Sequence, residues 1–238
     1  MIPDKHPLLP VALSAGVISA YVMIVCAYWR VPGAGKLNAL PACAVLTAYL
    51  WAAWRIPAWL SPHSTGALHA VAAAASIIFA AEIVLEYALL PKDNSRWGVV
   101  EFGAVFALYA VAAAISRARG GTIRAAARDA AYVAVICSLA WFVVVMAMYQ
   151  AFLGTGRQHG VFLAEGDLDD FRQSFPSGGN FDAFMVEDFM GAGFFHLLLG
   201  PALAAVVGVL SASFVSFTIK ILGRLSFMGH APGKTDSE

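Results

Sequence analysis

The stretch GALHAVAAAASIIFAAEIVLEYALL, residues 66–90, decides the fold of this chain. It is 25 residues long, and its only Asp, Glu, Lys or Arg side chains are Glu82 and Glu86. A helix needs about 20 consecutive apolar residues to cross the hydrocarbon core of a bilayer, so this stretch predicts a transmembrane helix. An acid near the centre of such a helix costs roughly 2.5–3.5 kcal/mol, which makes both carboxylates candidates for a functional role.

The composition of the whole chain indicates the same class of protein. Of its 238 residues, 60% are hydrophobic and 13% are charged, and the mean hydropathy is +0.73. Soluble domains carry about 25% charged residues, so the composition favours a chain embedded in lipid. The zero net charge argues against nucleic acid as a partner, because binding it would require a basic patch. Three scattered cysteines without a CxxC pair indicate neither a disulfide framework nor a zinc site.

Six apolar segments predict an all-α, polytopic transmembrane bundle. The bundle is expected to occupy residues 1–228 as a single unit, followed by a polar tail, 229–238. The last segment is 34 residues long and contains Gly200 and Pro201, which predict that its helix is kinked or broken there. The six segments cover approximately residues 8–29, 37–54, 66–90, 97–116, 130–153 and 189–222.

The positions of the basic residues predict the orientation in the membrane. The connection after the fourth segment carries four arginines, and loops rich in Lys and Arg stay in the cytoplasm. This placement puts both termini in the cytoplasm, with nine Lys and Arg residues inside and six outside. We therefore expect an integral protein of a bacterial-type inner membrane, with its four-arginine loop, formed by Arg117, Arg119, Arg124 and Arg128, on the inner side.

The long connection on the outer side, residues 154–188, is acidic and also rich in phenylalanine. A purely solvated linker would not need aromatic residues, so this loop is expected to fold back over the outer mouth of the bundle as a cap. Asp167, Asp169 and Asp170 form its most acidic part. A negative surface of this kind attracts cations or docks a basic partner.

The topology is expected to bring ionisable residues from three segments to a similar depth. Glu82 and Glu86 lie in the outer half of the third segment, Glu101 lies near the outer start of the fourth, and His196 lies near the outer start of the last. Together they could bind a divalent metal ion, with His196 as the nitrogen ligand. They could equally bind or relay a cation or a proton, because close carboxylates cannot all stay ionised.

Two classes of function follow from these features. The first is a small transporter or channel component in which Glu82, Glu86 and Glu101 act on a cation or a proton in the outer half of the bundle. The alternative is a non-catalytic membrane subunit of a larger complex, possibly a redox or metal-dependent one. Both classes favour a homo-oligomer or association with other membrane subunits within the lipid bilayer. An enzyme is less favoured, because GxGxxG, GxxxxGK[ST], GxSxG and HExxH motifs do not occur in the sequence.

Overall fold

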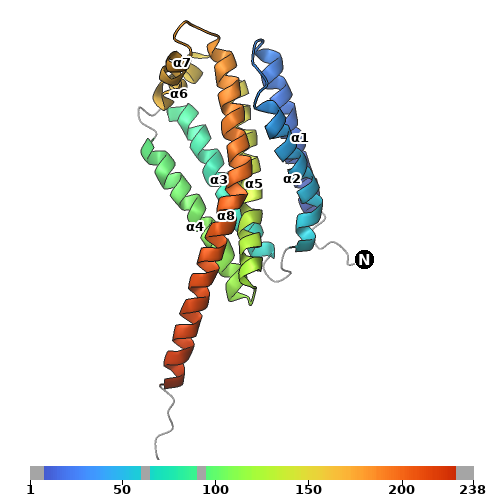
Figure 1. The fold of residues 1–238 in the computed structure, drawn as a ribbon, viewed down its shortest axis with the longest axis vertical. Helices are drawn as coiled ribbons and strands as arrows, with labels where there is room; N and C mark the ends of the chain where they lie inside the picture. The colour runs from blue at the N-terminus through green and yellow to red at the C-terminus, as the bar shows by residue number, and fades with distance from the viewer. Residues whose placement is uncertain (1–7, 60–64, 90–94, 229–238) are drawn as a thin grey trace, which may run out of the picture.

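The structure is a computed structural model that describes residues 8–59, 65–89 and 95–228. The polar tail expected at 229–238 lies outside these residues. Within them the chain forms an all-α bundle (Figure 1). Its helices are α1 (Leu8–Arg30), α2 (Ala39–Trp59), α3 (Thr65–Leu89), α4 (Ser95–Ala118), α5 (Ile123–Phe152), α6 (Gly156–Glu165), α7 (Asp167–Ser174) and α8 (Phe181–Met228).

Five of these helices, α1, α3, α4, α5 and α8, are long and apolar enough to cross a membrane. The chain is therefore an integral membrane protein with a polytopic helix bundle, as the sequence predicted. The second predicted segment forms α2, a helix of 21 residues that contains Arg55 and does not belong to this set of five. It packs against α1, and Figure 1 shows the two helices side by side along the bundle.

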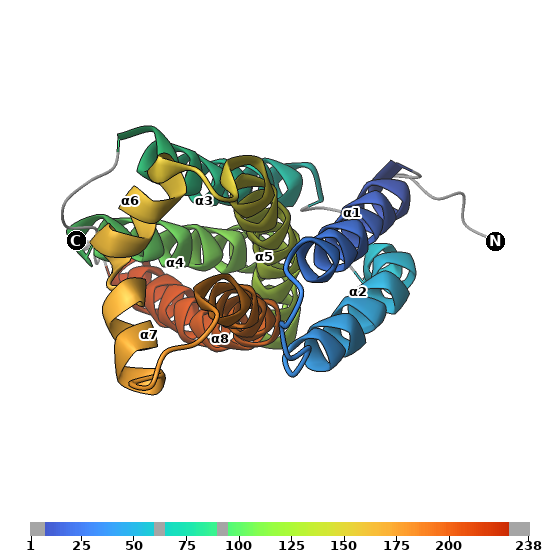
Figure 2. The same ribbon diagram turned by 90° about the horizontal axis from the view of Figure 1, so that it is seen from above.

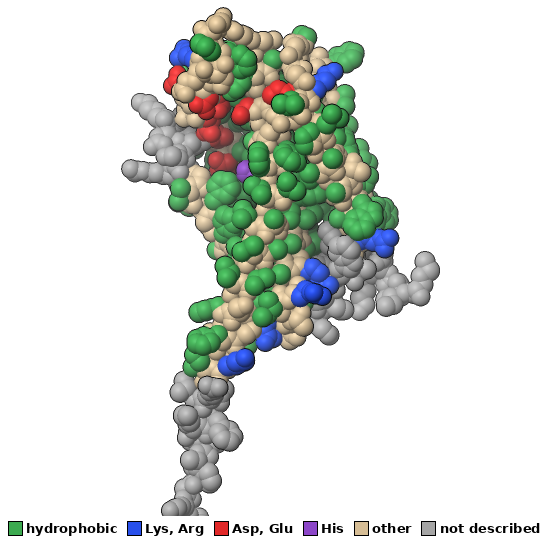
Figure 3. Space-filling view, in the orientation of Figure 1, with side chains coloured by type: hydrophobic (Ala, Val, Ile, Leu, Met, Phe, Trp, Pro, Cys, Tyr) green, Lys and Arg blue, Asp and Glu red, His purple; other side chains and the backbone are tan. Residues whose placement is uncertain are grey.

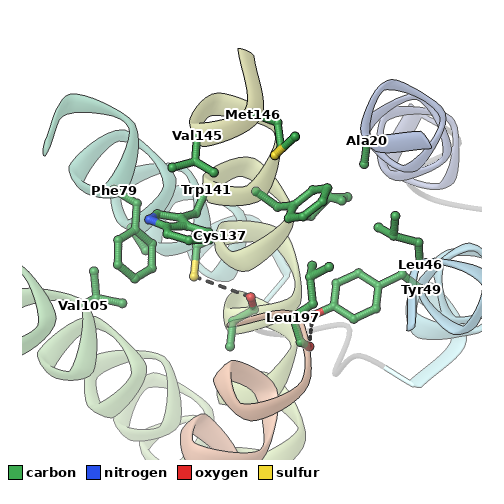
Figure 4. Packing of buried hydrophobic residues seen from close by; sticks show 14 of the residues in the cluster. Ala20, Leu46, Tyr49, Phe79, Val105, Cys137, Trp141, Val145, Met146 and Leu197 are labelled. Atoms are coloured by element: carbon green, nitrogen blue, oxygen red, sulfur yellow. Dashed lines mark hydrogen bonds between the residues drawn. The ribbon is translucent and has the colours of Figure 1, made fainter. Parts of the chain in front are cut away.

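The central helix of the bundle is α5, which contacts α1, α3, α4 and α8 (Figure 2). Buried side chains lie all around this helix and are not confined to one face. Figure 4 shows Trp141 and Val145 of α5 on the side of Phe79, while Leu46 and Tyr49 of α2 lie on the opposite side. The start of α5 is set by Thr122, whose side chain accepts a hydrogen bond from the backbone N–H of Ala125.

Because α5 starts here, most of the four arginines do not lie in a loop as expected. Helix α5 begins at Ile123 instead of near residue 130, so Arg124 and Arg128 belong to its first turns. Arg117 lies in the last turn of α4, which leaves Arg119 in the connection. The arginines still gather at one end of the bundle, and Figure 3 shows most blue side chains toward that end and the red ones near the other.

Helix α8 is continuous through Pro201, which agrees with the predicted kink and not with the alternative of a break. It has 48 residues and would be about 72 Å long if straight. Figure 1 shows its axis changing direction near the middle and its C-terminal part extending past the ends of the other helices. Proline removes one backbone donor and bends a helix, which accounts for a bend without a break.

The long connection is shorter and more ordered than expected. Helix α8 begins at Phe181, so Asp182, Glu187 and Asp188 lie on a helix instead of in the loop. The remaining residues contain α6 and α7. Helix α6 contacts α3 and α7 contacts α8, so the two short helices cover the end of the bundle where α3 ends and α8 begins (Figure 2). Gln158 fixes α6 to α5, because its side chain donates a hydrogen bond to the carbonyl of Tyr149 and accepts one from the backbone N–H of Gly154.

Candidate functional site

A cavity of about 470 Å³ lies at the acidic end of the bundle. Its walls come from α3, α4, α5 and α8, and α6 and α7 contribute from the connection above. Figure 3 shows acidic side chains gathered in a hollow on this part of the surface. We call it the acidic cavity, because six carboxyl groups line it: Glu82, Glu86, Glu101, Glu165, Asp167 and Asp188.

Helix α3 supplies the two acids of the opening stretch. Glu82 and Glu86 are four residues apart, so they lie on one face of the helix. Ile83 and Tyr87 of the same helix also line the cavity. Both glutamates are half-buried. The C-terminal end of α3 is held by Arg157, whose Nη1 donates hydrogen bonds to the carbonyls of Tyr87 and Ala88 at 2.8 and 2.7 Å.

The most buried of the lining carboxyl groups is that of Glu101 on α4, which is 8% exposed. Its Oε1 atom is buried and has no hydrogen-bond partner among the described residues. The hydroxyl of Tyr87, which also lines the cavity, is in the same state. A buried polar atom without a partner is costly, so these atoms are candidates for binding something that enters the cavity.

His196 of α8 lies among aromatic rings at the wall of the cavity. Its ring stacks on Phe102 with centroids 5.8 Å apart and planes 9° apart, and it lies 4.0 Å from the ring of Trp141. Its Nδ1 atom has no hydrogen-bond partner among the described side chains and backbone. His69, by contrast, packs against Tyr132 and does not line this cavity.

The connection contributes two further acids through a tight turn. Gly166, with φ of 91°, ends α6 and begins α7, and this left-handed conformation suits glycine. The turn places Glu165 and Asp167 on either side of it, and both reach the cavity. Glu165 shares a hydrogen bond with the side chain of Glu86, which joins the cap to α3. A hydrogen bond between two carboxyl groups requires a proton on one of them.

The environment of Asp167 changes its acidity. Burial raises its pKa to about 7, and the neighbouring charges of Asp188, Glu165 and Asp170 add to this shift. Both causes disfavour the ionised form, because the charge loses water and meets other negative groups. Asp167 therefore changes its charge near neutral pH.

The three acids expected to dock a partner do not all lie in the same place. Asp167 lines the cavity, whereas Asp169 and Asp170 are exposed on the outer face of α7 and do not. Asp169 forms an exposed ion pair with Arg172 at 3.2 Å, an i,i+3 pair within the helix. Acids in the first turn of a helix also stabilise its dipole, which gives Asp169 and Asp170 an ordinary structural role.

Sequence reasoning assigned neither Glu165 nor Asp188 to the site. Both belong to a connection that was expected to be acidic and to cap the bundle, but the sequence does not show which acids face inward. Asp188 also required knowing that α8 begins seven residues before it. The only sequence signal for Glu165 is its position next to Gly166, a glycine that indicates a turn within the acidic connection.

The geometry does not favour a preformed metal centre. Within residues 8–59, 65–89 and 95–228, no three His, Cys, Asp or Glu side chains are grouped as ligands of one metal ion would be. His196 packs against the rings of Phe79, Phe102 and Trp141. Among the described lining residues there is also no Lys or Arg to neutralise the six acids.

Comparison with known proteins gives no match to this chain among family models, curated proteins or solved structures.

Proposed function

We propose that this protein is a small membrane transporter or channel component that binds a cation or a proton in the acidic cavity. The observation that carries the proposal is the lining: six carboxyl groups from five helices, with no Lys or Arg among the described residues that line it. Structural ion pairs would instead have brought a basic side chain to these acids.

Charge repulsion explains why such a cavity must take up positive charge. Six carboxylates within one small cavity cannot all be ionised without a counter-charge, because each raises the free energy of the others. Neutrality is reached by binding protons, by binding a cation, or by exchanging one for the other.

The position of the cavity suits uptake from one side of the membrane. Asp167 lies at the cap and titrates near neutral pH, whereas Glu101 is the most buried of the acids that line the cavity. A cation would thus pass from the partly exposed acids of the cap toward Glu101. By the charge rule for loops this side is extracytoplasmic, and both termini are then cytoplasmic.

Reconstitution into liposomes tests the proposal. Wild-type protein should carry H⁺, Na⁺, K⁺ or Ca²⁺ when a gradient of each is imposed separately, measured with an ion-sensitive dye inside the vesicles. Glu82→Gln and Glu101→Gln should each lower that flux at least tenfold, because each removes one ionisable group from the cavity. Asp169→Asn is the matched control, since it removes an exposed carboxylate outside the cavity. Equal fluxes from wild type and both cavity variants, all correctly inserted, would reject the proposal.

A second candidate is a membrane subunit of a larger complex. The C-terminal part of α8 favours it, because this part extends beyond the bundle and exposes Phe214, Phe217 and Leu222 (Figure 1). Exposed apolar side chains on a projecting helix fit a surface that contacts another membrane chain or lipid. Purification from native membranes separates the two: a partner at fixed stoichiometry, together with no flux, would favour the subunit.

A further inference from the structure

The size of the acidic cavity argues against a bare ion as its natural occupant. Its volume of about 470 Å³ equals that of roughly 15 water molecules at about 30 Å³ each. Binding sites for small organic molecules range from about 300 to 1,000 Å³. Together with the dispersed carboxyl groups, which do not converge as metal ligands, this volume fits a molecular ligand.

One wall of the cavity is aromatic. Phe102, Trp141 and His196 line it: His196 stacks on Phe102 and contacts the tilted ring of Trp141, and Glu101 precedes Phe102 directly on α4. Aromatic faces attract an ammonium group through cation–π interactions and also pack against apolar carbon. A ligand that touches both Glu101 and this wall would combine a positive charge with an apolar body.

A second, apolar cavity adjoins the first. It has a volume of about 200 Å³ and shares Phe102, Ala192 and His196 with the acidic cavity. Phe106 and Leu203 contribute to its lining, and no acid or base other than His196 and Tyr109 is present among the described residues that line it. The two cavities thus form a charged chamber and an apolar chamber on either side of one shared wall.

We infer that the acidic cavity binds an organic ammonium ion whose charged group lies among Glu82, Glu86 and Glu101 and whose apolar body lies against Phe102, Trp141 and His196. This inference rests on the proposed function and adds the chemical class of the cation. The buried Oε1 atom of Glu101, which has no partner among the described residues, supplies an acceptor for the ammonium N–H groups.

Binding of 2-phenylethylammonium to the purified full-length protein tests the inference by calorimetry. Methylammonium has the charge without the apolar body, and 2-phenylethanol has the body without the charge. We expect 2-phenylethylammonium to bind at least tenfold more tightly than either. Glu101→Gln should weaken its binding at least tenfold. Phe102→Ala should weaken it roughly fivefold, the scale of one contact between aromatic rings, and leave methylammonium binding unchanged because methylammonium has no ring to pack there.

Asp169→Asn serves as the control variant for binding, and thermal unfolding establishes that each variant is folded. Phe102→Leu replaces Phe102→Ala if the alanine variant does not fold, because leucine keeps most of the volume without the ring. Equal affinity for methylammonium and 2-phenylethylammonium would overturn the inference, as would unchanged binding by folded Glu101→Gln.

The flux experiment separates failure of the inference from failure of the proposed function. Flux of an inorganic cation or of protons that depends on Glu101, without binding of 2-phenylethylammonium, would reject the organic ligand and leave the transport proposal standing. Tight, Glu101-dependent binding of 2-phenylethylammonium without flux of any tested ion would support the ligand class and reject transport of those ions.

Discussion

At the scale of single residues, Glu101 has the costliest environment in the acidic cavity. It is the most buried of the lining acids, and one of its oxygens has no partner among the described residues. The sequence placed Glu82 in the middle of an apolar stretch, yet Glu82 is half-buried whereas Glu101 is buried. The reason is that burial at this depth depends on which face of α4 meets α3 and α8, and the sequence does not specify that contact.

The substitution Asp167→Asn tests whether the raised pKa of Asp167 lowers the stability of the folded protein at high pH. The pKa of Asp167 in the folded protein is about 7, above the usual value near 3.9, so the folded state keeps its proton longer than the unfolded state. The free energy of unfolding therefore falls as pH rises from about 4 to about 7. Asparagine removes this loss, so the melting temperature of the variant should exceed that of wild type at pH 8, and the gain should shrink toward pH 5.

Thermal unfolding in detergent across this pH range measures the effect. Asp169→Asn is the control, because this exposed acid does not line the cavity and its loss should produce no such pH-dependent gain. A gain for Asp167→Asn that is the same at pH 5 and pH 8 would show that its carboxyl group is not the titrating group.

At the scale of elements, small residues determine how closely α8 approaches α5. Gly200, Ala204 and Gly208 recur every four residues, a spacing that is typical of close packing between helices. The structure places this stripe inside the chain: a Cβ atom on Gly208 would lie 2.8 Å from Cα of Ala127. Ala204 is fully buried on the same face.

Gly208→Ala should therefore destabilise the bundle by about 1–3 kcal/mol, because the added methyl group meets backbone that cannot move aside cheaply. Gly103→Ala on α4 is the matched control, since nothing lies within 4 Å of the added atom. Removing this glycine should leave the stability unchanged or raise it by up to about 1 kcal/mol. Unfolding by denaturant in mixed micelles measures both, and equal stabilities for the two variants would contradict the packing.

Glu187 connects α8 to the α1–α2 pair at the acidic end. Its carboxylate accepts hydrogen bonds from the hydroxyl of Tyr28 at 2.9 Å and from the backbone N–H of Asn38 at 3.1 Å. The Asn38 side chain donates to the carbonyl of Glu187 at 2.9 Å. Asn38 directly precedes α2, so Glu187 stabilises the start of that helix.

Glu187→Ala should lower the free energy of unfolding by about 1–3 kcal/mol, because it leaves the Tyr28 hydroxyl and the backbone N–H of Asn38 without an acceptor. It should also speed hydrogen exchange in the turn between α1 and α2. Glu187→Gln keeps one oxygen acceptor and should lose less. Unchanged exchange in that turn for Glu187→Ala would mean that the two hydrogen bonds accepted by the Glu187 carboxylate do not hold the helices together.

At the scale of the whole molecule, hydropathy was sufficient to predict the class and most of the helices. Long apolar runs form helices wherever the chain is placed in lipid, so α1, α3 and α4 lie close to their predicted ranges. Helix ends were less predictable, because α5 and α8 continue into polar sequence that hydropathy assigns to loops. Those continuations brought Asp188 into the cavity wall.

The candidate site was predictable only as far as topology allows. Alternating helix directions place Glu82, Glu86, Glu101 and His196 in the same half of the bundle, and all four line the acidic cavity. The aromatic surroundings of His196 were not predictable, since they depend on side chains from α3, α4 and α5 meeting at one level. These aromatic surroundings are the observation on which the proposal of an organic cation rests.

Infrared difference spectroscopy tests the central claim, exchange of positive charge by the cavity carboxyl groups, most directly. Addition of 2-phenylethylammonium or Na⁺ to wild-type protein should decrease the band of protonated carboxyl groups, because the cation displaces protons from them. Glu101→Gln should show a smaller change, and Asp169→Asn should match wild type. A carboxyl band that none of H⁺, Na⁺, K⁺, Ca²⁺ or 2-phenylethylammonium alters in wild type would contradict the account.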